Sequence, residues 1–136
     1  MIVLDSSAIV DALIGDPANP DLLALIADTE LHAPALIDYE VASALRGHVL
    51  AEKLLDRHLE NATENFGALR IERYPLSSMM GAVLDLRANY TVYDAAYVVL
   101  ALALDAPLVT ADAKLLEARK IGVDVRVLRP PQETQT

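Results

Sequence analysis

The sequence lacks cysteine and tryptophan, and it contains one phenylalanine among its 136 residues. Without cysteine there is no disulfide, no thiolate nucleophile and no zinc–thiolate centre. Basic residues are also scarce: 11 lysines and arginines stand against 20 aspartates and glutamates, which gives a formal net charge of −9. Because nucleic-acid binding usually depends on basic contacts with phosphate, this balance favours a cation or a basic protein partner, or a nucleic acid bridged by a metal.

Long apolar segments are missing as well. The run without charge at residues 95–104 is half the roughly 20 residues that a membrane-spanning helix needs, so we expect a buried helix there and no membrane contact. The first residues, 1–5, carry no basic side chain and reach an aspartate too early for a signal peptide, so we expect a cytoplasmic protein. Hydrophobic residues make up 54% of the chain, which predicts one well-cored domain over residues 1–130 and a flexible tail at 131–136.

Short apolar segments alternate with helical patterns along the chain. Strands are expected at residues 2–4, 31–33, 70–74, 108–110 and 123–128. Helices are expected after Ser6 or Ser7, which would cap the first of them, and at about residues 21–28, 35–46, 75–89, 94–104 and after 112. Residues 49–66 are expected to form one amphipathic helix or a pair of helices. In the 49–66 segment, the leucines at 50, 54, 55 and 59 are predicted to face inward. This alternation indicates an α/β fold with a parallel sheet of about five short strands, covered on both faces.

Two aspartates follow directly on predicted strands. Asp5 comes after residues 2–4, and Asp112 comes just after residues 108–110. Ligands of open parallel sheets bind outside the carboxyl ends of the strands. Both carboxylates are therefore predicted to lie at the same rim of the sheet, although either could simply cap the helix that follows it.

Two further acids stand in unusual helical positions. Glu40 falls about 40° from Leu36 on a helical wheel, inside the apolar arc of its helix. A carboxylate there needs a metal, an arginine partner or a helix end close to solvent. Asp94 opens the uncharged helix, where the spacing from Thr91 also matches a capping box. The other candidates are interpreted as solvated or turn acids, namely Asp11, Asp38, Asp85 and Asp105.

Taken together, four acids at such positions predict a cation site. Two carboxylates about 4 Å apart repel each other by about 4 kcal/mol at an effective dielectric constant near 20, so a cluster must bind protons or a cation. Oxygen-only ligands favour Mg²⁺, with Mn²⁺ as a substitute, and His32, His48 and His58 lack the spacing of a zinc site. Magnesium on carboxylates is typical of phosphodiester hydrolysis, and it would also supply the positive field that a phosphate needs.

Four segments together resemble the PIN-domain nucleases, and specifically the VapC-type toxins of toxin–antitoxin pairs. They are VLDSSA at 3–8, PALIDYEVASALR at 34–46, YTVYDAAYVVLALAL at 90–104 and PLVTADAKLL at 107–116. The resemblance covers nearly the whole chain. It implies a three-layer α/β/α fold, Mg²⁺-dependent endoribonuclease activity, homodimerisation, and inhibition by a cognate antitoxin whose basic C-terminal segment enters the acidic site.

By position, the resemblance assigns the family's acidic quartet to Asp5, Glu40, Asp94 and Asp112, with supporting hydroxyls on Ser7 and Thr110. We expect the three aspartates to hold Mg²⁺, and Glu40 to position the ion or take a proton from the attacking water. Candidates for phosphate contact are Arg46, Arg87 and Lys114, for which solvated surface charge is the alternative.

The strongest rival function is a non-catalytic PIN-like module that only binds a protein partner. A phosphoacceptor domain would need paired acids after the first strand and a lysine after the last, and the chain has neither. A phosphatase with an aspartate nucleophile would need a second aspartate two places after Asp5, where Ser7 stands.

Overall fold

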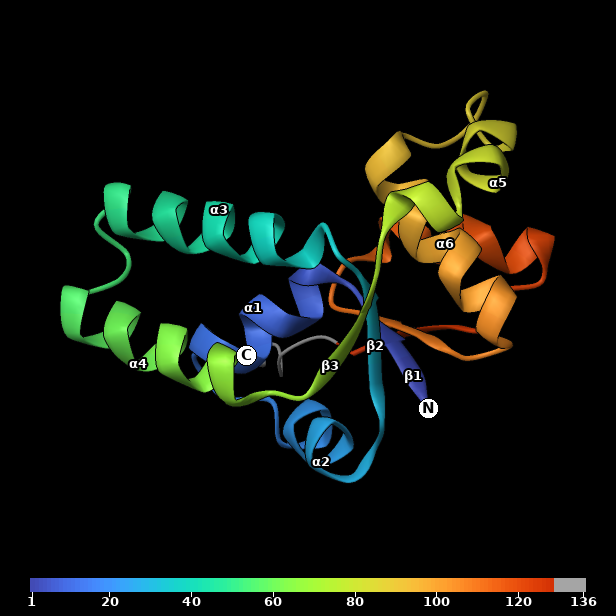
Figure 1. Ribbon diagram of the computed structural model, residues 1–136. Coiled ribbons are helices and arrows are strands. Elements are labelled where there is room, and N and C mark those ends of the chain that lie inside the picture. Colours follow the sequence, from blue (N-terminus) through green and yellow to red (C-terminus); the bar gives the residue numbers. More distant parts are fainter. Residues whose placement is uncertain (129–136) are drawn as a thin grey trace, which may run out of the picture.

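Five parallel strands form the centre of the computed structural model, which describes residues 1–128 (Figure 1). In chain order they are β1 Ile2–Leu4, β2 Leu31–Pro34, β3 Ile71–Tyr74, β4 Leu108–Thr110 and β5 Val125–Val127. Their spatial order is β3-β2-β1-β4-β5. Val3 of β1 pairs with His32 of β2 on one side and with Leu108 of β4 on the other. The predicted parallel sheet is confirmed, and β3 lies at one edge of it.

Helices cover both faces of this sheet, as Figure 1 shows. The α-helices are α1 Ser6–Ile14, α2 Pro20–Asp28, α3 Ile37–Leu50, α4 Asp56–Ala68, α5 Met80–Asp85 and α6 Val92–Leu104, and the 3₁₀ helices are η1 Leu76–Ser78 and η2 Ala113–Ile121. Successive strand residues point to opposite faces. Leu4 therefore packs in the core under α1 and α3, and Val3 packs in the core under α6. This arrangement confirms the three-layer α/β/α architecture.

Helix α6 is the buried helix that the uncharged run predicted. Thr91 caps its first turn, since its side-chain oxygen accepts a hydrogen bond from the Asp94 backbone N–H at 3.1 Å. All seven residues from 95 to 101 are buried. The helix ends at Asp105, which adopts a left-handed conformation with φ of 49° and turns the chain into β4.

Residues 49–66, for which the sequence allowed one helix or a pair, belong to two helices: α3 extends to Leu50, and α4 begins at Asp56 after a turn. The prediction that Leu50 and Leu55 face inward was wrong. Leu50 and Leu55 flank this turn and are 64% and 57% exposed, because side chains at the tip of a helical hairpin project past the core. Leu54 and Leu59 are half-buried against the α1–α3 core, as predicted.

The segment 75–89 is also broken rather than a single helix. Met79 has φ of −129° between η1 and α5, outside the helical range, and its side chain is 8% exposed in the core beneath α6. We attribute the break to the burial of this side chain. After Asp112 the chain forms a 3₁₀ helix, and the cap of α1 is Asp5 rather than Ser6 or Ser7.

Within residues 1–128, no helix has both the length and the apolar character that crossing a bilayer requires. The predicted tail at 131–136 and the domain boundary at residue 130 lie outside the described residues.

The two leucines Leu100 and Leu102 on α6 provide a test of this packing. Leu100 is 2% exposed and Leu102 is 42% exposed. Replacing Leu100 with alanine is expected to lower the free energy of unfolding by about 2–5 kcal/mol, because it leaves a cavity under the sheet. The matched change Leu102→Ala should lower it by less than about 1 kcal/mol. Urea unfolding measures both, and equal losses would contradict the burial of α6 as described.

Candidate active site

The candidate site lies where the strand order of the sheet reverses. From β1 the chain moves outward to β2 and β3, and it then returns to β4 on the other side of β1. Ligands of parallel α/β sheets bind at the carboxyl ends of the two strands that flank such a reversal. Asp5 follows β1 and Thr110 is the last residue of β4, so both stand at this point. The predicted meeting of residues from β1 and β4 is thus observed.

Hydrogen bonds fix the Asp5 carboxylate from both sides. Ser7 Oγ donates to Asp5 Oδ1 at 2.7 Å, and the backbone N–H of Ala8 donates to the same oxygen at 3.0 Å. Thr110 Oγ1 donates to Asp5 Oδ2 at 2.6 Å. Ser7 and Thr110 therefore hold this carboxylate in one orientation.

Burial makes this carboxylate costly when it is charged. Asp5 is 4% exposed, and this burial raises its pKa above the ordinary value of 3.8. The hydrogen bonds from Thr110, Ser7 and Ala8 and the positive charge of Lys114 lower the pKa, but by less than burial raises it. A buried charge is stabilised by donors and by nearby cations. Asp5 also caps α1, but three donors on a nearly inaccessible carboxylate exceed what a cap alone requires.

Asp112 joins this cluster through its backbone. Its N–H donates to Thr110 Oγ1 at 3.0 Å, which ties the loop after β4 to the hydroxyl that holds Asp5. Its side chain is exposed, and Asp112 Oδ1 accepts a hydrogen bond from the Lys114 backbone N–H at 3.0 Å, which caps η2. The capping role considered for Asp112 is therefore real, and it occupies one of the two carboxylate oxygens.

Asp94 reaches the site through an ion pair. Lys114 Nζ lies 3.2 Å from Asp94 Oδ1. Partial burial alone would lower the pKa of Lys114, but its hydrogen bond to Asp94 and the charges of Asp94, Asp112 and Asp5 raise it. One ammonium group is thus within electrostatic reach of three of the four predicted acids. The hydroxyl of Thr91 caps α6, and the Asp94 carboxylate faces the cation.

Glu40 is held by a residue to which the sequence analysis gave no role. Tyr97 on α6 donates its hydroxyl proton to Glu40 Oε1 at 2.6 Å. Burial, the bond to Glu40 and the charges of Glu40 and Asp5 raise the pKa of Tyr97, so its hydroxyl stays protonated as a donor. The available signal was that Tyr97 is the only polar side chain in residues 95–104 and follows Asp94 by one helical turn.

The donor chemistry of the site fits a hard divalent cation. The acids and hydroxyls around Asp5 provide only oxygen ligands, which Mg²⁺ and Mn²⁺ prefer, and a cationic side chain already lies among them. In the conformation described for residues 1–128, no three or more histidine, aspartate or glutamate side chains are grouped closely enough to hold a metal ion. The Asp94 carboxylate is directed at Lys114 instead.

The two predicted arginines lie apart from these contacts. Arg46 is exposed and lines a cavity of about 360 Å³ between α3 and α4, together with Leu59 and Phe66. Arg87 is exposed and donates to the Leu84 carbonyl oxygen at 3.0 Å, just beyond the end of α5. Neither side chain joins the hydrogen bonds that link the acids.

Asp38 is an exposed acid, as interpreted, with 46% of its side chain accessible. It also forms a forked pair with Arg73, whose Nη2 lies 2.9 Å from Asp38 Oδ1. Asp11 has a buried oxygen, Oδ2, that accepts no hydrogen bond within the described part of the chain, and burial raises its pKa. The interpretation of Asp85 and Asp105 as exposed acids is consistent with the structure.

A large groove begins beside the carboxylate cluster. It has a volume of about 690 Å³ and starts at Ser6, Ser7 and Ala111. Its apolar wall includes Val10, Ile14 and Leu54, and its polar side includes Asp11, Asp16, His48 and Lys53. The site is therefore open on this side to a ligand much larger than an ion.

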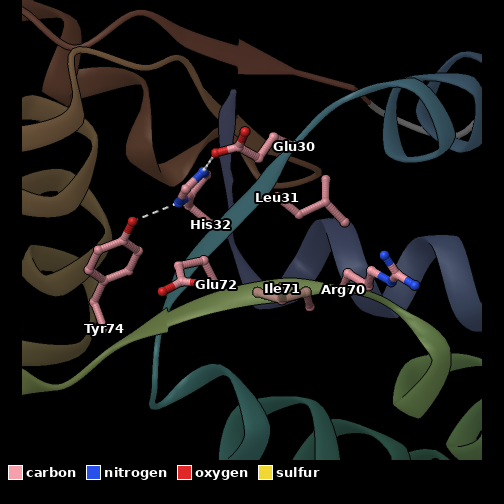
Figure 2. A pocket seen from close by; sticks show the side chains of 7 residues that line it. All are labelled: Glu30, Leu31, His32, Arg70, Ile71, Glu72 and Tyr74. Carbon is pink, nitrogen blue, oxygen red and sulfur yellow. Dashed lines mark hydrogen bonds and ion pairs between the residues drawn. The ribbon is translucent and has the colours of Figure 1, made fainter.

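Another cavity, of about 410 Å³ and with polar walls, lies near the amino ends of β2 and β3, away from the four predicted site acids (Figure 2). Its central side chain, His32, is 5% exposed. His32 Nδ1 lies 2.7 Å from Tyr74 Oη, and His32 Nε2 lies 2.6 Å from Glu30 Oε1. Both ring nitrogens are thus satisfied within the fold, which indicates a structural role for His32.

Comparison with known proteins agrees with this architecture. The family model described as "PIN domain" matches residues 2–121. Ribonuclease VapC1 of Mycobacterium tuberculosis is 38% identical over 129 residues, which cover 93% of this chain and 97% of that protein. Ribonuclease VapC9 of the same species is 37% identical over 128 residues, which cover 94% and 98%. Ribonuclease VapC12 is 34% identical, with coverage of 94% and 99%.

A solved structure shares the fold. The crystal structure of PAE2754 from Pyrobaculum aerophilum superposes with a TM-score of 0.62 at 24% identity and covers 91% of this chain and 87% of that one. At this identity the likeness supports the fold alone. Together with the family match and the relatives, it shows that this chain belongs to the PIN domain family and, within it, to the VapC group.

Proposed function

We propose that this protein is a Mg²⁺-dependent endoribonuclease of the VapC toxin type, which hydrolyses RNA phosphodiester bonds and also accepts Mn²⁺. The observation that carries the proposal is the buried Asp5 carboxylate, held by Ser7 and Thr110 where the sheet order reverses. The relatives named above are called ribonucleases, which supports the same reaction class.

The residues that would hold the ion are Asp5, Asp94 and Asp112, with Glu40 directly or through water. When bound, the divalent ion supplies Lewis-acid chemistry: it makes water more acidic and neutralises charge that develops on phosphate oxygens. For Asp94 to serve as a ligand, its carboxylate must leave Lys114, whose ammonium is then available to a phosphate. Arg46 and Arg87 remain predicted phosphate contacts.

Side chains of the protein orient the carboxylate, accept a proton and bind the RNA. Ser7 and Thr110 donate to the two oxygens of Asp5 and so keep its carboxylate aligned without reorganisation during the reaction. Tyr97 occupies Glu40 Oε1, which leaves Oε2 to accept the proton of the attacking water. The groove that starts at Ser6 and Ser7 provides room for the RNA chain on either side of the cleaved bond.

The proposed partners follow from charge and exposed apolar surface. A net charge of −9 and a cation-binding site suit a cognate antitoxin whose basic C-terminal segment enters the site. The helices η1, α5 and α6 carry exposed apolar side chains that a second copy of the chain could bury in a homodimer: Leu76, Met80, Leu84, Val92 and Tyr93. We also propose a cytoplasmic location, where RNA and the antitoxin would meet the protein.

Asp94→Asn tests the assignment of a metal ligand. It keeps the size of the side chain and removes its charge, so it is expected to reduce Mg²⁺-dependent RNA cleavage at least about 100-fold. The far-ultraviolet circular dichroism spectrum should not change. Cleavage is measured by sequencing the 5′ ends of RNA fragments, with a Mg²⁺-free control. Asp85→Asn, at an exposed acid on α5, should cleave like the wild type, and undiminished cleavage by Asp94→Asn would remove Asp94 from the site.

Tyr97→Phe tests the positioning of Glu40. The change removes one hydroxyl and frees Glu40 Oε1, so kcat is expected to fall about 10- to 100-fold while KM changes little. The free energy of unfolding should fall by about 1 kcal/mol. Steady-state cleavage of a short RNA and urea unfolding measure the two effects. A loss of stability with unchanged kcat would assign Tyr97 a purely structural role.

Asp5→Asn separates the nuclease from a non-catalytic binding module. Burial raises the pKa of Asp5 in the folded protein above 3.8. The contribution of this carboxyl to the free energy of unfolding is therefore larger at acidic pH, where the carboxyl is protonated, and it falls as the pH rises through the folded-state pKa. The metal-free variant is therefore expected to melt at a higher temperature than the wild type at pH 7, and the difference should shrink toward pH 4.

Mg²⁺ or Mn²⁺ should raise the melting temperature of the wild type and leave that of Asp5→Asn unchanged. If neither ion shifts the melting temperature of the wild type, the non-catalytic module becomes the better explanation.

A further inference from the structure

Lys114 lies at the centre of the acidic site rather than on its margin. Its backbone N–H donates to Asp112 Oδ1 at 3.0 Å, and its ammonium nitrogen lies 3.2 Å from Asp94 Oδ1. One residue therefore contacts an acid that follows β4 and an acid on α6, two segments that meet only in the folded protein. The Asp5 and Asp112 charges also act on the same ammonium.

One aspartate is in contact with this ammonium, and the charges of two more act on it. Asp5 is nearly inaccessible, and burial raises the pKa of its carboxyl despite three hydrogen bonds. A positive group nearby lowers the energy of all three aspartates at once. Lys114 can supply that charge, since its ammonium nitrogen lies 3.2 Å from Asp94 Oδ1.

The ion pair is also free to open. The Lys114 side chain is 56% exposed and the Asp94 side chain is 26% exposed, so the ammonium can swing into solvent about its flexible stem without disturbing the core. A partly exposed pair of this kind is weak, and a divalent ion on several carboxylates can readily replace it.

We propose that Lys114 is a built-in counter-ion of this site, whose ammonium neutralises the aspartates in the metal-free protein and must release Asp94 before a divalent cation can bind. The inference rests on the proposed function for the location of the metal site. Lys114 competes with the metal ion for Asp94, and this competition lowers the affinity of the site for metal. Metal binding in turn releases the Lys114 ammonium, which can then bind a phosphate.

The affinity for metal tests this competition. Lys114→Met keeps a flexible side chain of similar length without charge, and it is expected to bind Mn²⁺ about tenfold more tightly than the wild type in isothermal titration calorimetry. Lys114→Arg, which retains the charge, should stay within about threefold of the wild type. The matched control is Lys120→Met, at an exposed lysine near the end of the same 3₁₀ helix, which should also bind like the wild type.

Metal-free stability provides a second readout. Without metal and at low salt, Lys114→Met is expected to melt at a lower temperature than the wild type, because the aspartates lose their counter-ion. Saturating Mg²⁺ should remove most of this difference.

Displacement itself can be followed by nuclear magnetic resonance. The chain has three lysines, Lys53, Lys114 and Lys120, so ¹⁵N-lysine labelling yields three side-chain signals, and Lys114→Arg assigns one of them. The Lys114 signal is expected to shift on addition of Mg²⁺ while the other two stay in place.

Two results would overturn the inference while leaving the proposed function intact: Mn²⁺ binding by Lys114→Met no tighter than by the wild type, or a Lys114 signal that does not respond to bound Mg²⁺. If the wild type binds neither ion, the metal-dependent function fails and the inference fails with it.

Discussion

The burial of one carboxylate governs the arrangement of this site. Asp5 must leave water because it directly follows a strand that lies in the middle of the sheet, between β2 and β4. A buried charge is tolerated only with donors and a nearby positive group. Ser7, Ala8 and Thr110 provide the donors, and Lys114 provides the charge. The other acids are arranged around this requirement.

Helix α6 brings the remaining acids to Asp5. Because its residues 95–101 are buried between the sheet and its outer neighbours, the helix has little freedom to rotate, and the positions of Asp94 and Tyr97 are set by the packing of apolar side chains. Tyr97 then places Glu40 of α3, on the other side of the sheet, by a single hydrogen bond. Core packing and site geometry are therefore not separable in this protein.

The same contacts reduce the electrostatic cost of placing several acids close together. A cluster of aspartates would destabilise the fold if each remained charged and unpaired. Here Asp112 caps η2, Asp5 caps α1, and Asp94 pairs with Lys114. Each acid thus has a structural partner that uses part of its hydrogen-bonding capacity, which leaves the remaining oxygens for a ligand.

The sequence by itself determined the parallel sheet, the buried helix α6 and the placement of Asp5 and Asp112 after strands that end at one rim. The reason is that strand alternation, an uncharged run and the direction of parallel strands are local or topological properties. It did not predict the break at Met79 or the exposure of Leu50 and Leu55, because these depend on which apolar side chain reaches the core.

Only the tertiary structure decided that Tyr97 binds Glu40 and that Lys114 binds Asp94. These partners are 57 and 20 positions apart in the chain, and no periodic pattern connects them. Such contacts depend on how layers of the fold pack against one another, and that packing is fixed by the whole core rather than by any one segment.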